Sequence, residues 1–281
     1  MATTLDAVLA QYEKSQQGST SGTSKMSQDE RMKKYFAALL KDNEKQGQKR
    51  LRILPTKDGS SPFKEVFFHE VQIDGKWVKL FDPGANSSER SPLNEVYEEL
   101  MMAGDKELAR NYKSRKFYIV KVIDRDNEQD GPKFWRFKHN YKNEGVLDKI
   151  IPIWRSKGDI TDADKGRDII LEMTKAKTPK GLSYTVIQTV MYEDPTQLHE
   201  NKETYDSWVN DELTWEDVYS KKPVEYLEAI ARGETPRWNT ELGKYVYGDS
   251  TSGEETFGGS KALSKIADPQ ANNDPDEDLP F

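Results

Sequence analysis

Residues 110–142 combine basic and aromatic side chains in a sorted pattern. Both flanks of this stretch carry lysine and arginine but no acid, whereas all four of its acids lie in the central sequence DRDNEQDG. Lysine and arginine neutralise phosphates, and aromatic faces stack on unpaired bases of any identity. The pattern indicates binding of a nucleic acid strand. The alternative is an ordinary hairpin with core aromatics and a solvated charged face, and the stretch alone favours neither.

Two further stretches repeat this chemistry. The sequence KRLRILPTK opens a predicted strand at residues 49–57, and the loop at 175–183 places three lysines before a tyrosine. We expect phosphate contacts from basic residues in all three stretches and base stacking from their aromatic residues. The candidates are the basic residues Lys49, Arg50, Arg52, Lys57, Arg110, Lys113, Arg115, Lys116, Lys133, Arg136, Lys138 and Lys177, and the aromatic residues Tyr112, Tyr118, Trp135, Phe137 and Tyr184.

Catalytic chemistry has weak support in the sequence. The chain has no cysteine, its three histidines fall at no recognisable catalytic spacing, and the phosphate-loop pattern GxxxxGK[ST] is absent. Asp162, Asp164 and Asp168 lie close together, and a metal-dependent nuclease could use such a set. The alternative is a solvated loop before a strand, which we favour. We therefore predict no catalytic residue, no cofactor and no metal site.

Charge is distributed unevenly along the 281 residues. The net charge is −7, but residues 49–192 carry 27 basic and 22 acidic side chains, whereas residues 193–281 carry 8 basic and 21 acidic ones. A basic middle and an acidic end suggest that one part binds a polyanion and the other regulates that binding. The N-terminal sequence MATTLDAVLAQYEK has no long apolar run, so we expect no signal peptide. The sequence also has no apolar run of 18 residues, so we expect no membrane span.

Short strand signals dominate the middle of the chain. Asp74-Gly75 lies between two apolar runs and predicts a hairpin. Six or seven strands in about 145 residues favour a small barrel or sandwich. We expect a mainly β protein with added helices, whose core is an OB-fold, a five-stranded Greek-key barrel. The expected divisions are a terminal segment and linker at 1–26, the core at 27–195 with an inserted subdomain at about 62–108, an acidic helical region at 196–247 and a disordered tail at 248–281.

The chain ends on an acidic run with an apolar tip. An exposed terminal phenylalanine lowers solubility, so we expect a partner protein to bind this tip through an apolar slot and basic groups. The ending resembles the tip of bacterial single-stranded DNA-binding protein, where an Asp-rich run ends in Ile-Pro-Phe and docks on replication, repair and recombination proteins. The expected partner-binding residues are Asp276, Glu277, Asp278, Leu279, Pro280 and Phe281.

The basic domain resembles the single-stranded DNA-binding protein of T-even phages over about residues 49–192. The matching segments, in order, are RLRILPTKDGSSPF, the hairpin from Phe68 to Trp77, YKSRKFY at 112–118 and FWRFK at 134–138. That family has a zinc site of one His and three Cys. Here His69 stands at the His position, Asp82 near one Cys, and Ser91-Pro92-Leu93-Asn94 at the Cys-Pro-x-Cys turn. Serine and asparagine are poor zinc ligands, so we predict that the turn is kept and the metal lost.

The resemblance implies a function and a setting. It implies a non-enzymatic, sequence-independent single-stranded DNA-binding protein that protects and holds open single strands in phage replication, recombination and repair, in the cytoplasm of a bacterial host. It also implies partners such as a polymerase, a helicase or helicase loader, and a recombinase, and self-association along DNA. The N-terminal segment lacks that family's basic motif, which argues against self-association by that route. The alternatives are an RNA-binding OB-like module, a metal-dependent nuclease, or a scaffold that contacts an acidic protein.

Overall fold

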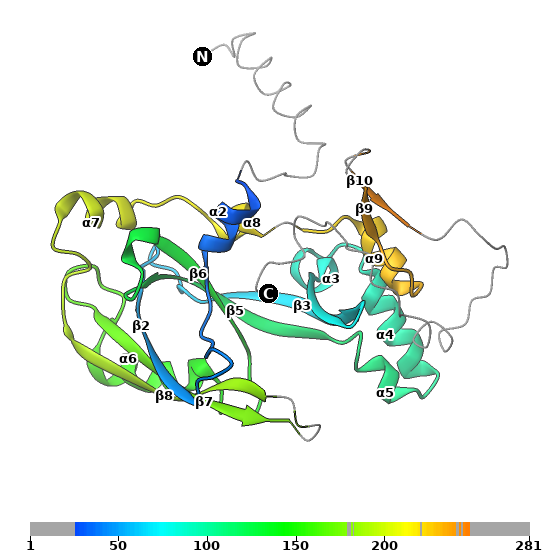
Figure 1. Ribbon diagram of the computed structural model, residues 1–281, viewed down its shortest axis with the longest axis horizontal. Coiled ribbons are helices and arrows are strands. Elements are labelled where there is room, and N and C mark those ends of the chain that lie inside the picture. The colour runs from blue at the N-terminus through cyan, green and yellow to red at the C-terminus, as the bar shows by residue number, and fades with distance from the viewer. Residues whose placement is uncertain are drawn as a thin grey trace, which may run out of the picture.

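Figure 1 presents the computed structural model of the chain, which describes residues 26–247 apart from residues 179, 180, 182, 220, 240, 241 and 243. The expected N-terminal segment lies outside the described residues except for Met26. The expected tail and its tip at 276–281 also lie outside them. None of the described helices is long and apolar enough to cross a membrane.

Most of the strands belong to one large mixed sheet. The strand order is β1-β6-β5-β2-β7-β8, and β3 pairs with both β4 and β5. Only the pairing of β1 with β6 is parallel. The bounds are β1 (Tyr35–Phe36), β2 (Gln46–Ile53), β3 (Lys64–Ile73), β4 (Lys76–Phe81), β5 (Ser114–Asp124), β6 (Pro132–Lys138), β7 (Arg167–Lys177) and β8 (Ser183–Pro195).

Four strands of the sheet follow a Greek-key path. Along the chain β2, β5 and β6 form a meander, and the chain then passes through α6 (Val146–Lys157) before β7 pairs with β2. The spatial order β7-β2-β5-β6 places the fourth strand beside the first, which defines a Greek key. The sheet is not closed, because β6 and β8 are not paired in the described part of the chain. The structure is therefore mixed α/β, with no closed five-stranded barrel among the described residues.

The connection from β2 to β5 carries the expected insertion. It contains the hairpin β3–β4 and the helices α3 (Pro83–Ser87), α4 (Pro92–Met102) and α5 (Lys106–Ala109). The Asp74-Gly75 turn forms as predicted, with both residues at positive φ. Proline at the first position of α4 suits a helix start, since its missing N–H would have no partner there. A hairpin and three helices thus lie in the stretch for which the sequence predicts an inserted subdomain.

The acidic region after β8 is helical but also contains a small hairpin. Its helices are α7 (Lys202–Val209), α8 (Trp215–Val218) and α9 (Val224–Ala231), followed by the two-stranded sheet of β9 (Arg237–Asn239) and β10 (Lys244–Val246). In Figure 1 the yellow chain from α7 to α8 runs above β5 and β6, and α9 lies beside α4. This region therefore touches both the Greek-key part and the insertion.

The sequence from Ser27 predicts a helix whose apolar stripe continues through Phe36 to Leu40, but the helix observed there is much shorter. The helix α2 (Gln28–Lys33) begins at a capping box on Ser27 but ends after six residues. The chain then pairs with β6 through Tyr35 and Phe36. Phe36 and Leu40 are buried in the core of the Greek-key part, so tertiary packing overrides the helical pattern here.

Candidate nucleic-acid interface

The paired strands β5 and β6 place alternate residues on opposite faces. Tyr118 faces Phe137 across the pair, and Val120 faces Trp135. All four belong to the main core, where Trp135 is 2% exposed and Tyr118 and Phe137 are 8% exposed. An aromatic ring buried in the core offers no face to a base. The structure therefore corrects the stacking role expected for Tyr118, Trp135 and Phe137.

Two of the expected phosphate-binding cations are also buried. The Arg52 side chain is fully buried and donates to Asp168 at 3.1 Å and to the carbonyl oxygen of Thr196 at 2.7 Å. Lys133 is 6% exposed and pairs with Asp124 at 3.3 Å and Asp130 at 2.8 Å. Both side chains connect neighbouring segments of the fold, so the structure corrects their assignment as phosphate contacts.

The opposite face of the same strands gathers the basic residues. Pairing places alternate residues of β3, β4, β5 and β6 on this face, so charges far apart in the sequence become neighbours. Six of these positions are lysine or arginine, whereas a single one is acidic. We call this surface the basic face, and its charged residues are Lys64, Glu70, Lys79, Arg115, Lys121, Arg136 and Lys138.

Electrostatics on the basic face favour an anion. The Glu70 carboxylate pairs with Arg115 at 3.1 Å and also with Lys138. Burial, with the nearby positive charge of Arg136, lowers the pKa of Lys79 to about 8. Burial likewise lowers the pKa of Arg136 to about 10. Since charge on Lys79 and Arg136 is costly in the free protein, a bound anion would be stabilised there.

The centre of the basic face is apolar and covered. Trp215, Val218 and Tyr219 of the acidic region pack on Phe68 and its apolar neighbours. The Trp215 ring also stacks on the ring of Phe81, with centroids 6.1 Å apart. This cover divides the basic face into one group of cations near Glu70 and a second group near Lys121.

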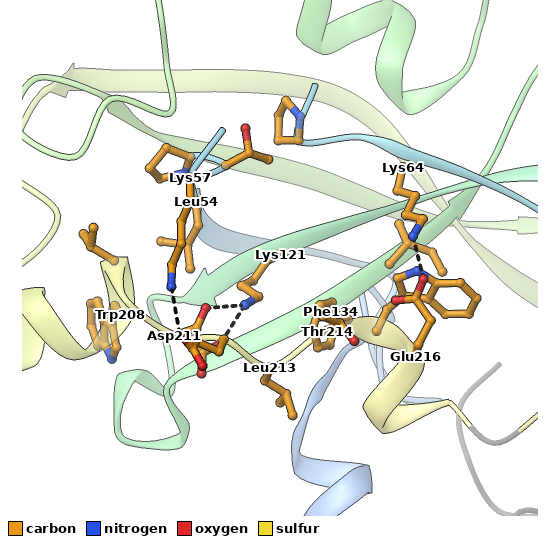
Figure 2. Close-up of a pocket in the computed structure, with 17 residues that line it drawn as sticks. Leu54, Lys57, Lys64, Lys121, Phe134, Trp208, Asp211, Leu213, Thr214 and Glu216 are labelled. Carbon is orange, nitrogen blue, oxygen red and sulfur yellow. Dashed lines mark hydrogen bonds and ion pairs between the residues drawn. The ribbon is translucent and has the colours of Figure 1, made fainter. Parts of the chain in front are cut away.

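Beside Trp215 lies a pocket of about 460 Å³ between the sheet and the acidic region. Its apolar lining includes Leu54, Ile119, Phe134 and Trp208. Figure 2 shows this pocket, with Lys121 facing Asp211 of the segment that connects α7 to α8 and Lys64 facing Glu216 of α8. We call it the lysine pocket, after its three lysines Lys57, Lys64 and Lys121.

The predicted loop residues at 175–184 occupy the end of the hairpin β7–β8. Lys177 is exposed at the end of β7, and Tyr184 is 48% exposed on β8. Lys177 pairs with Ser183 and Tyr184 with Ala176, so their side chains leave opposite faces of the hairpin. Both residues are at the surface, where an exposed tyrosine can stack on a base and a lysine can contact a phosphate.

The other candidates lie at the surface or in its outer layer. Lys49 pairs with Asp126 at 3.9 Å, and Arg50 with Glu193 at 3.4 Å, on strand β2. Lys116 pairs with Glu65 at 2.9 Å. Arg110 and Lys113 are exposed near the start of β5, whereas Tyr112 is half-buried against the insertion core. Tyr112 is thus held in the fold, and Lys49, Arg50 and Lys116 have acidic neighbours.

The aspartates that suggested a nuclease are used by the fold. Asp168 accepts hydrogen bonds from Arg52 and from Arg125, whose Nε lies 2.8 Å from its Oδ2. Asp162 accepts from the backbone N–H groups of Asp164 and Lys165, both at 2.8 Å. Across the described residues, no group of three or more His, Cys, Asp or Glu side chains could hold a metal ion. The geometry gives the nuclease alternative no support.

The four residues at the position of the phage zinc site do come together. The His69 Nε2 lies 3.5 Å from Asp82 Oδ1 and 3.4 Å from Ser91 Oγ, and Asn94 Nδ2 donates to Asp82 at 3.0 Å. His69 and Asp82 are fully buried. The polar groups of these residues thus contact one another. Retention of the phage turn and loss of the metal both stay predictions, and stoichiometric zinc in protein purified without added metal would contradict the second.

Sequence reasoning missed Lys64, Lys79, Trp208 and Trp215. Lys64 and Lys79 lie in the two strands that flank Asp74-Gly75, but their shared face depends on strand pairing that the sequence does not specify. The tryptophans lie in the acidic region, whose contact with the sheet is long-range. No protein-family model matches this chain, and no curated protein matches its sequence.

Proposed function

We propose that this protein binds single-stranded DNA without sequence preference. The observation that carries the proposal is the basic face, where six cations and one carboxylate lie on four adjacent strands. Cations in a row neutralise a phosphate backbone, and the neighbouring lysine pocket and exposed Tyr184 offer apolar and aromatic surface to bases. Neither kind of contact reads a base edge, so binding would be independent of sequence.

We also propose that the Greek-key part is an OB-fold with a partly open barrel. In an OB-fold, strands 2 and 3 and the loops after strands 1 and 4 bind oligonucleotides. The strands β5 and β6 take the second and third places of the meander, the insertion takes the first loop, and the turn from β7 to β8 takes the loop after strand 4. The basic face and the Lys177–Tyr184 hairpin end thus coincide with the expected binding surfaces.

Such binding would have a simple consequence for DNA. A protein that binds unpaired strands but not duplex shifts melting by mass action, so it would hold templates open and protect them during replication, recombination and repair. The T-even phage resemblance and the acidic tip at 276–281 extend the proposal to a phage replication system in a bacterial cytoplasm. The tip would recruit polymerase, helicase or helicase loader, or recombinase.

The test is a titration of the full chain with poly-dT, followed by tryptophan fluorescence at several salt concentrations. We expect log K to fall linearly with log salt, with a slope of about −3 if about four phosphates are neutralised. A preference for duplex, or an affinity indifferent to salt, would overturn the proposal. Competition between matched DNA and RNA oligomers separates it from the RNA-binding alternative, which a clear RNA preference would favour.

A further inference from the structure

The lysine pocket has an unusual arrangement of charge. Each of its three lysines faces one acid from the segment 211–216. Lys121 Nζ lies 2.7 Å from Asp211 Oδ2, Lys64 Nζ lies 2.5 Å from Glu216 Oε1, and Lys57 Nζ lies 3.7 Å from Glu212 Oε1. Figure 2 shows these lysines around the pocket with the acids on the opposite side. The acids therefore occupy the positions that phosphates would take.

The apolar part of the pocket suits a base. The lining includes the aromatic residues Phe134, Trp208 and Trp215, each of which is 5–7% exposed and so offers only a small part of its surface to a base. Leu54 and Ile119 complete the apolar lining. A volume of about 460 Å³ lies in the range of small-molecule sites. A nucleotide needs both parts, because its base is apolar on both faces and its phosphate is anionic.

The acidic segment has a buried tryptophan at each end, an irregular stretch between them and an anchor at Asp211. Trp208 and Trp215 are 5% and 7% exposed, whereas residues 211–214 form neither helix nor strand. The pocket lysines also hold Asp211 and Glu212 to different degrees. Lys121 is about four-fifths buried and donates to both the carbonyl and the carboxylate of Asp211, but Glu212 is 90% exposed.

We propose that the lysine pocket is a nucleotide-binding site for the single strand, and that Glu212 and Glu216 occupy its phosphate positions in the free protein. This inference rests on the proposed function. Lys57 and Lys64 would exchange their acids for phosphates of the strand, with one base entering the apolar part. Exposed ion pairs stabilise a fold very little, so this exchange costs little. Lys121 keeps Asp211 and holds the segment in place.

Paired variants of the full chain test the site by the poly-dT salt titration. The double variant Glu212→Gln and Glu216→Gln removes the competing charges, and we expect affinity at low salt to rise about tenfold. The control is Glu98→Gln with Glu99→Gln, which changes net charge equally at exposed positions of α4. An equal rise in both would show a general charge effect and would overturn the inference.

The lysines supply an independent measurement. Lys57→Ala with Lys64→Ala should weaken binding about tenfold and make the salt slope less steep by about 1.4, since two phosphate contacts are lost. Both side chains are more than half exposed, and a thermal melt confirms that the variant folds. An unchanged slope in a folded variant would overturn the site. Absence of poly-dT binding by the unaltered chain would instead overturn the proposed function.

Photocrosslinking locates the base. Thymidine oligomers carrying one 5-bromouracil, irradiated in complex with the full chain, should crosslink to peptides that contain Phe134, Trp208 or Trp215. Crosslinks at these residues support the proposal. Crosslinks confined to other peptides, such as the one with Tyr184, would contradict base entry into the pocket while leaving single-strand binding intact.

Discussion

Asp82 is the residue whose ionisation the fold depends on most clearly. It is fully buried in the insertion and contacts His69 and Asn94. Burial alone would raise the pKa of Asp82, but the polar side chains of His69, Ser114 and Ser91 around the carboxylate outweigh burial and hold this pKa well below its usual range. A carboxyl whose pKa is lower in the folded state stabilises the fold when ionised.

Because the pKa of Asp82 is lower in the folded state, its ionised carboxylate stabilises the fold only over a defined pH range. The stabilisation by Asp82 is fully present above its unfolded pKa, near 4, and is lost as pH falls toward the folded pKa. We expect Asp82→Asn to lower the free energy of unfolding by about 1–3 kcal/mol at pH 7, and by less at pH 3. Urea denaturation at both pH values measures this difference. A difference that stays constant between pH 7 and pH 3 would contradict the assignment.

At the residue scale, the sequence predicted which residues belong to one site better than it predicted the direction in which their side chains point. The resemblance placed His69, Asp82 and Asn94 at or near positions of one metal site, and the structure brings the three side chains together. The sequence could not decide which aromatics of β5 and β6 face outward, since both faces of β5 carry apolar side chains. Burial of Trp135 and exposure of Tyr184 follow from the pairing of distant strands, which periodicity within one strand does not contain.

Among the elements, the hairpin β7–β8 offers a matched comparison of two tyrosines. Tyr184 pairs with Ala176 and Tyr192 with Ile169, and a register shift lies between these pairs. Ala176 and Ile169 are an odd number of residues apart on β7, so the tyrosines lie on opposite faces. Their exposed fractions are similar, at 48% and 40%.

We therefore expect Tyr184→Ala to weaken poly-dT binding about 5- to 150-fold, which corresponds to the loss of one base stack of about 1–3 kcal/mol. The control is Tyr192→Ala, whose ring already contacts Lys157 and Arg167 within the protein. We expect the control to bind nearly normally. Equal losses in the two variants would contradict a stacking role for Tyr184.

The sequence predicted elements well where the signal is local. The Asp74-Gly75 hairpin, the hairpin around the acidic turn after β5 and the start of α4 at Pro92 all form. It failed where distant parts of the chain meet. Residues after Lys33 leave the predicted helix to pair with β6, and the acidic region covers the sheet through Trp215. Neither event has a local sequence signature.

At the scale of the whole molecule, the acidic end of the chain carries a charge opposite in sign to that of the basic face. Residues 193–281 carry a strong net negative charge, part of which lies in the tip at 274–281. We expect deletion of these eight residues to raise DNA affinity at low salt, because a tethered polyanion competes for the same cations, and to abolish partner recruitment. The poly-dT titration at low and high salt and a pull-down of replication proteins measure the two effects. If deletion changes neither, the tip has neither role.

The strand β5 belongs to two parts of the molecule at once. Its first half pairs with β3 of the insertion and its second half with β2 of the Greek-key part, while β6 pairs along most of its length. The eleven residues of β5 span about 36 Å, and this one continuous strand connects the two parts. We therefore do not expect the insertion and the Greek-key part to move toward each other around a bound strand. A bound strand would instead lie along a surface whose length is set by β5. Each protein molecule would then occlude the same number of nucleotides on any template.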